Sequence, residues 1–149
     1  HKVHHAEKDL DVSSGLRFHT IEMLISMLIK SLVIIAIGIP VKAVLVFEII
    51  LNGMAMFNHS NLFIPVKIDN WLRKLVVTPD MHRIHHSVDM KEANSNFGFN
   101  LSVWDFLFRT FTKDPKQTHE TIELGEPGSK DVNKQSLWWI LTYPFRKNI

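Results

Sequence analysis

The sequence predicts an all-α integral membrane protein, in which a helical hairpin enters the bilayer and a cytosolic helical cap carries histidine motifs. Two apolar stretches, 21–38 and 41–57, are separated by Gly38 and Pro40, which is the pattern of two helices joined by a tight turn. One histidine pattern occurs twice, as HKVHH at 1–5 and HRIHH at 82–86, on either side of the hairpin. A strong helix start immediately precedes the second copy, so the motifs are expected on helices.

Composition limits the function classes. The chain has 149 residues, enough for one domain with a sizeable core, and its net charge of +2 gives no reason to expect a nucleic acid partner. It has no cysteine, which excludes disulfides, thiolate zinc sites and iron–sulfur clusters. Any metal must therefore be held by nitrogen and oxygen ligands.

The first element is the HKVHH motif at 1–5. Positions i, i+3 and i+4 share one face of a helix, so each motif gathers three imidazoles. Neutral imidazole is the commonest metal ligand in proteins and suits zinc, copper, iron and nickel. The two motifs hold six of the nine histidines, which favours a metal site over an ordinary helix surface.

The second element is the hairpin over residues 21–57. Each apolar stretch has about 17 residues, or about 26 Å of helix, near the lower limit for crossing a hydrocarbon core of about 30 Å. Lys30 lies in the middle of the first stretch and Glu48 within the second. A charge at that depth must pair, reach the interface or face protein. Membrane insertion is favoured over a buried hairpin of a soluble protein.

The hairpin also predicts topology, because two passes return the chain to the side from which it left. Both histidine motifs then face the same compartment. Arg17 precedes the hairpin, and Lys67, Arg73 and Lys74 follow it, so the positive-inside tendency places this face in the cytosol, although Lys42 at the turn weakens the asymmetry.

Residues 65–77 follow the hairpin. Trp71, together with the basic residues, suits a short amphipathic helix at the membrane interface, and a solvated helix packed on a core is the alternative. The next helix has a clear start: Thr78 can cap it, Pro79 suits its first position, and Asp80 complements its dipole. HRIHH therefore opens a helix.

The last elements are a loop with Asn96 and Gly98, an aromatic-rich segment over 97–111, and a tail. We place a domain boundary between 1–111 and 112–149. Residues 113–135 are expected to be a polar, exposed tail. Trp138 and Trp139, followed by a basic end, suit an interfacial anchor or equally a segment packed on the domain.

Six imidazoles exceed the needs of one tetrahedral zinc and fall short of two octahedral metals, so a two-metal site is expected. His59 at the end of the hairpin and His19 at its start could add ligands, whereas His119 is expected to be exposed. Nearby carboxylates could orient the imidazoles or simply lie on the surface; they are Glu7, Asp9, Asp80 and Asp89.

The chain resembles the fatty acid hydroxylase and sterol desaturase superfamily of membrane-bound, histidine-rich diiron enzymes. The resemblance runs from His1 to about Phe111. Beyond the two motifs and the hairpin, it is carried by Gly15-Leu16-Arg17-Phe18-His19, Asn58-His59, Thr78-Pro79-Asp80-Met81, Asn96-Phe97-Gly98 and Trp104-Asp105-Phe106-Leu107-Phe108. Thr20 stands where the family often has proline, and Arg109 where it often has glycine.

This resemblance implies an oxygenase that uses dioxygen at two irons to hydroxylate or desaturate a lipid carbon chain. Zinc could replace iron as an occupant of the site, since imidazole discriminates poorly between metals. The resemblance implies an external electron-donor protein and the metal ligands His1, His4, His5, His59, His82, His85 and His86. It also implies an earlier two-histidine motif. We therefore expect the sequence to be a C-terminal fragment that is inactive alone.

Other functions are compatible with the same residues. A non-catalytic membrane protein that stores or senses zinc would use the same ligands, since imidazole discriminates poorly between metals. A soluble helical interaction domain would require the hairpin to stay out of membranes. Sterols, fatty acyl chains, sphingolipids, alkyl ethers and carotenoids are all compatible substrates.

Overall fold

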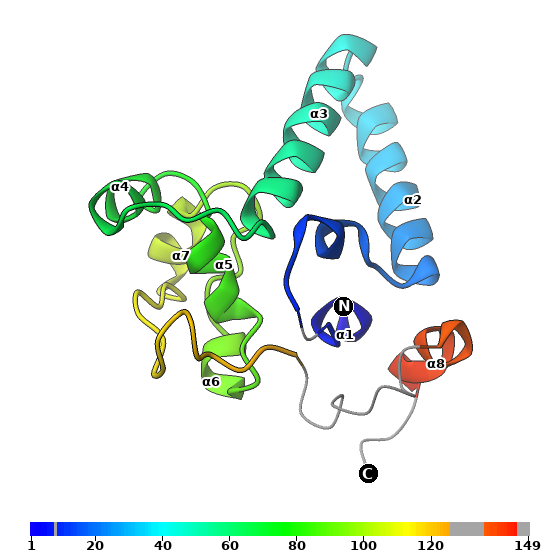
Figure 1. Cartoon of the computed structure of the whole chain (residues 1–149). Coiled ribbons are helices and arrows are strands. Elements are labelled where there is room, and N and C mark those ends of the chain that lie inside the picture. Colours follow the sequence, from blue (N-terminus) through cyan, green and yellow to red (C-terminus); the bar gives the residue numbers. More distant parts are fainter. Residues whose placement is uncertain (8, 126–135, 146–149) are drawn as a thin grey trace.

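The computed structural model describes residues 1–7, 9–125 and 136–145. The described part of the chain is helical and contains no strand, only two isolated antiparallel bridges, Val76 with Leu101 and Ser87 with Leu124. Figure 1 shows a hairpin of two long helices rising from a cluster of short ones. The predicted all-α fold, with a hairpin and a helical cap, is confirmed.

The hairpin consists of α2 (Thr20–Ile37) and α3 (Val41–Asn58). Gly38 ends α2 with φ +73°, a left-handed conformation that glycine adopts at little cost, and Pro40 precedes α3. Both helices are long and apolar enough to cross a membrane. No residue of α2 is buried and α3 buries only Ala55 and Asn58, so the apolar surface faces outward, as in a membrane protein.

An ion pair joins the two helices halfway along the hairpin. The Lys30 ammonium lies 2.5 Å from the Glu48 carboxylate and 5.8 Å from the centroid of the Phe47 ring. Pairing lowers the cost of holding each charge among apolar side chains. The two charges that could have argued against membrane insertion thus compensate each other.

The cap contains α1 (Lys2–His5), the 3₁₀ helix η1 (Val12–Leu16), α4 (Val66–Leu72), α5 (Pro79–His85), α6 (Met90–Ala93) and α7 (Val103–Phe108). As predicted, Thr78 caps α5 by accepting from the Met81 amide, and Pro79 is its first residue. Met81 and Ile84 project from α5 into the core and are fully buried. This packing fixes the face of α5 that carries histidines.

The described part of the tail is mostly exposed, as expected, but it is anchored to the cap. The Gly125 amide donates to the His86 carbonyl at 3.1 Å, and the Lys116 amide donates to the Glu92 carboxylate at 2.6 Å. The tail therefore wraps α5 and α6. The expected segment 126–135 and the basic end at 146–147 lie outside the described residues.

The aromatic end forms α8 (Leu137–Thr142) and the 3₁₀ helix η3 (Tyr143–Phe145), which lie below α2 in Figure 1. Trp139 is 5% exposed and Trp138 is 73% exposed. The two interpretations of this segment thus apply to different residues. Trp139 packs on the protein, and Trp138 is free to contact a membrane.

Candidate metal centre

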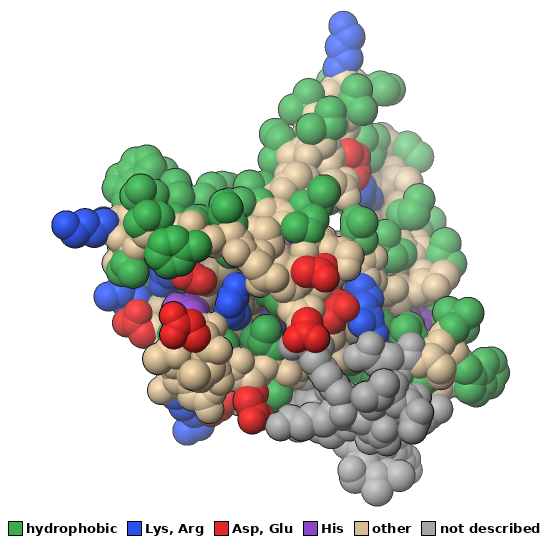
Figure 2. Space-filling view, viewed as in Figure 1, with side chains coloured by type: hydrophobic (Ala, Val, Ile, Leu, Met, Phe, Trp, Pro, Cys, Tyr) green, Lys and Arg blue, Asp and Glu red, His purple; other side chains and the backbone are tan. Residues whose placement is uncertain are grey.

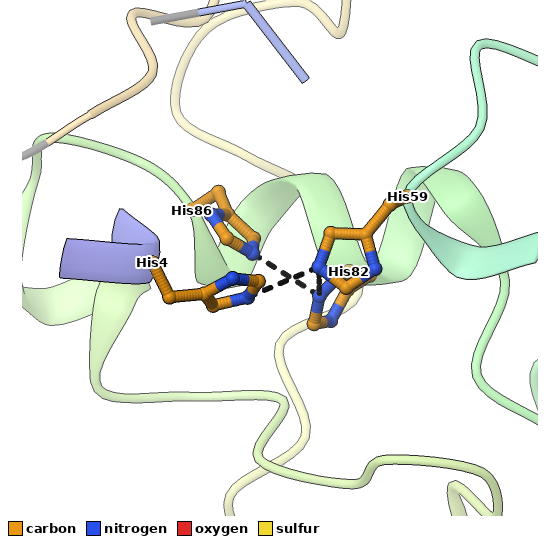
Figure 3. Close-up of side chains that lie close together, drawn as sticks. All are labelled: His4, His59, His82 and His86. Atoms are coloured by element: carbon orange, nitrogen blue, oxygen red, sulfur yellow. Dashed lines mark hydrogen bonds between the residues drawn. The ribbon is translucent and has the colours of Figure 1, made fainter. Parts of the chain in front are cut away.

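The structure gathers seven histidines into two adjacent groups. The inner group is His4, His59, His82 and His86, all buried; the outer group is His1, His5 and His85. In each group the ligand nitrogens lie within 4.8 Å of one another. Figure 3 shows the four imidazoles of the inner group, from three separate segments, pointing at a common centre. All seven residues predicted as ligands are brought together.

The two sequence motifs do not correspond to the two groups. In the first motif, His1 and His5 belong to the outer group and His4 belongs to the inner group. In the second motif, His82 and His86 belong to the inner group and His85 belongs to the outer group. Each motif therefore contributes to both groups, and His59 completes the inner one, so the expected two-metal arrangement has a geometric basis.

The ring nitrogens that face each other are Nε2 atoms. In the inner group Nε2 of His59 lies 3.1 Å from that of His4 and 3.0 Å from that of His82. In the outer group Nε2 of His5 lies 3.1 Å from those of His1 and His85. Two imidazoles bound at right angles to a metal, with bonds of about 2.1 Å, hold their nitrogens about 3.0 Å apart. These spacings match a metal site.

Backbone carbonyls determine the tautomer of His4, His59 and His85. Nδ1 of His59 lies 2.7 Å from the Ala55 carbonyl, and Nδ1 of His4 lies 3.2 Å from the Arg17 carbonyl. A carbonyl can only accept, so in a neutral ring the proton is on Nδ1 and Nε2 carries a lone pair. The Nε2 atoms of His4 and His59 therefore face each other as two acceptors, an unfavourable contact that a cation between them would relieve.

Protonation does not supply that cation. Burial, followed by repulsion from the neighbouring imidazoles, lowers the pKa of His4 and of His5 to about 3. Burial also lowers the pKa of His82 and of His86 well below the ordinary value. These rings are neutral near pH 7, which is the form that binds metals. The donor set thus fits a metal.

The four predicted carboxylates do not orient these imidazoles in the described structure. Glu7 pairs with an arginine of the segment before α2, and Asp9 is exposed. Asp80 lies 3.9 Å from His119, and Asp89 caps α6. Backbone carbonyl oxygens orient imidazoles instead of these carboxylates. One of them is the Ser95 carbonyl oxygen, which lies 2.9 Å from Nδ1 of His85.

The remaining two histidines lie outside both groups. His19, a candidate ligand, caps α2 by accepting from the Ile21 amide, and its Nε2 lies 3.1 Å from the Leu141 carbonyl. His119 is half-buried beside Asp80 rather than fully exposed. Both therefore have structural contacts that account for them.

The sequence did not reveal the role of Asp105. This residue is 1% exposed and accepts from the Phe97 amide at 2.7 Å, the Gly98 amide at 2.8 Å and the Thr110 hydroxyl at 2.6 Å. It thereby fixes the loop that begins beside Ser95, whose carbonyl orients His85. Asp105 and its partners lie in two motifs noted in the sequence, Asn96-Phe97-Gly98 and Trp104-Asp105. Neither motif by itself shows that the Asp105 carboxylate accepts hydrogen bonds from the loop amides.

Three cavities reach the outer group. One of about 620 Å³ runs from His1 along α2 to Lys30 and is also lined by Pro144 and Phe145. A second of about 400 Å³ extends from His1 between the bases of α2 and α3 to Lys30 and Glu48. A third of about 310 Å³ is lined by His5, His85 and residues of α6. No histidine of the inner group lines any of these three cavities. The outer group is thus the accessible part of the centre.

Sequence comparisons agree with this centre. The sequence model of the fatty acid hydroxylase family matches residues 1–110. The chain is 30% identical to ornithine lipid hydroxylase OlsE of Rhizobium tropici over 122 residues, which are 82% of this chain and 36% of that protein. It is 27% identical to alkylglycerol monooxygenase of Homo sapiens, over 74% of this chain and 24% of that protein.

The corresponding enzyme of Xenopus tropicalis is 27% identical over 93% of this chain and 31% of its own length. The chain thus spans about a third or less of these relatives. No solved structure matches it significantly. Because the family match covers most of the sequence and includes every histidine of both groups, the chain belongs to the fatty acid hydroxylase family.

Proposed function

We propose that the chain forms the metal-binding part of a membrane-bound diiron oxygenase that oxidises a lipid C–H bond with dioxygen. The observation that carries this proposal is the pair of adjacent histidine groups, in which Nε2 atoms of neighbouring imidazoles face each other and those of His4 and His59 do so as two acceptors. Family membership and the lipid hydroxylases and monooxygenases among its relatives support the reaction class.

Each of the two histidine groups would hold one iron. The four inner imidazoles would bind one iron, and the three outer imidazoles would bind the other. When bound, the irons supply the activation of dioxygen that an unactivated C–H bond requires. Burial of the inner group excludes water, and the carbonyls bonded to Nδ1 hold His4 and His59 in the tautomer that binds a metal through Nε2.

The lipid would reach the outer group from the bilayer. The cavity between the bases of α2 and α3 joins the hairpin to His1, so an acyl or alkyl chain could approach the outer group from the hairpin, past the Lys30–Glu48 pair. We propose that the cap lies on the cytosolic side of a multi-pass protein, following the positive-inside tendency. An external electron-donor protein would then reach the centre from the cytosol.

Lipid-dependent oxygen consumption tests this function. The iron-loaded full-length protein, supplied with an electron donor, should consume oxygen with membrane lipid extracts and yield products that mass spectrometry identifies as hydroxylated or desaturated. His85→Ala should reduce the rate by at least about 100-fold, because it removes one of three outer ligands. The matched control His119→Ala, outside both groups, should retain activity.

Two outcomes would count against the proposal. Full activity of His85→Ala would remove the outer group from the reaction. Protein isolated with zinc, showing no lipid-dependent oxygen uptake after iron loading, would favour the alternative of a zinc store or sensor.

A further inference from the structure

A further cavity in the cap contains no histidine and has a different chemical character. It measures about 410 Å³, lies between α4 and α7, and is lined by four basic residues, Lys67, Arg73, Lys74 and Lys113. No residue of the inner or outer group reaches it. A ligand bound here would be separate from the lipid that is oxidised.

The positive charge of this cavity is only partly neutralised. Arg73 is paired with Asp69 on the next turn of α4, and Lys113 lies 3.7 Å from the exposed carboxylate of Asp114. Lys67 and Lys74 are exposed and form no ion pair within the described residues. Arg73 is 4% exposed, yet its Nε has no hydrogen-bond partner. This excess of donors and positive charge suits an anion.

Aromatic side chains make up much of the rest of the cavity lining. Trp71, Phe106 and Phe111, together with Asn70, complete its lining. Phe63, which precedes α4, and Phe108, the last residue of α7, are 83% and 69% exposed, which is costly in water. Figure 2 shows hydrophobic side chains over α4 on the side toward which the hairpin rises, and basic side chains at its outer end.

Basic and aromatic side chains together are typical of surfaces that lie at a bilayer interface, where the rings enter the acyl region and the cations meet phosphates. Helix α4, which contributes Lys67 and Trp71 to the cavity, is the next helix after the hairpin and lies beside its base in Figure 1. We propose that the cavity between α4 and α7 binds the headgroup phosphate of an anionic phospholipid, through Lys67, Lys74 and Lys113, and thereby docks this edge of the cap onto the membrane.

Native mass spectrometry of the full-length protein in an uncharged detergent tests the site. Titration with dioleoylphosphatidylglycerol should give a saturable bound lipid, and dioleoylphosphatidylcholine should bind about tenfold more weakly because its net charge is zero. The variant Lys67→Ala/Lys74→Ala should bind phosphatidylglycerol at least about tenfold more weakly. Lys42→Ala/Lys91→Ala, which removes two exposed lysines elsewhere, should behave like the wild type.

Three outcomes would overturn the proposed lipid site. Equal losses in the two double variants would reduce the effect to general charge attraction, and unchanged binding in Lys67→Ala/Lys74→Ala would show that these lysines do not hold the headgroup. Displacement of phosphatidylglycerol by millimolar inorganic phosphate would identify a free-anion site instead. Iron content should be unchanged in both variants, so that this test is independent of the proposed oxygenase function.

Discussion

At the scale of single residues, the centre depends on which ring nitrogen of each histidine carries the proton. Three rings, His4, His59 and His85, have Nδ1 within hydrogen-bond distance of a backbone carbonyl. This leaves Nε2 free to bind a metal. Spacing in the sequence could predict which histidines share a site, but the acceptors that set the tautomer are carbonyls, which every residue possesses and no motif marks.

The lowered pKa values predict how the metal-free protein responds to acid. Well above pH 6.5, His4 and His5 are neutral in both the folded and unfolded states. As the pH falls, the unfolded chain takes up protons near pH 6.5, whereas folded His4 and His5, with a pKa of about 3, do not. Stability is therefore expected to be fully present above pH 6.5 and to fall progressively towards pH 3.

Thermal unfolding of chelator-treated full-length protein, measured between pH 7.5 and pH 5, checks this expectation. The midpoint should decrease over this range, and less steeply in His4→Gln, which removes one buried imidazole. A midpoint that does not change, or a slope unaffected by His4→Gln, would contradict the assigned protonation states.

At the scale of elements, the sequence identifies the long helices and the capped start of α5, because apolar length and the Thr-Pro-Asp signal are local properties. It does not reveal how η1 meets α3, which is a long-range contact. A Cβ at Gly15 would lie 2.9 Å from the Ala55 carbonyl oxygen and 3.3 Å from Nδ1 of His59. Gly15 thus permits the close approach that encloses His59.

Gly15→Ala should therefore separate η1 from α3 and disturb the His59 hydrogen bond to Ala55. We expect it to lower the unfolding free energy by about 1–3 kcal/mol, as overpacking generally does, and to weaken metal retention. Thermal unfolding and metal analysis of the purified variant measure both effects.

The matched control is Gly53→Ala on α3, where an added Cβ meets no atom within 4 Å. It should be neutral or slightly stabilising, because alanine is the better helix former. Equal behaviour of the two variants would mean that the contact between η1 and α3 does not support the centre.

At the scale of the whole molecule, the division of the two motifs between the inner and outer groups is the feature that sequence patterns could not reveal. Each motif predicts a face with three imidazoles, and two such faces suggest one metal each. The fold instead brings α1, α5 and the end of α3 together so that each motif serves both groups. Loss of either motif is thus expected to affect both metals.

The iron content of the purified full-length protein tests the central claim most directly. Metal analysis by inductively coupled plasma mass spectrometry, on protein loaded with ferrous iron and freed of excess metal, should give two irons per chain. A content of one iron or fewer per chain would contradict the claim that the inner and outer histidine groups form a two-metal centre.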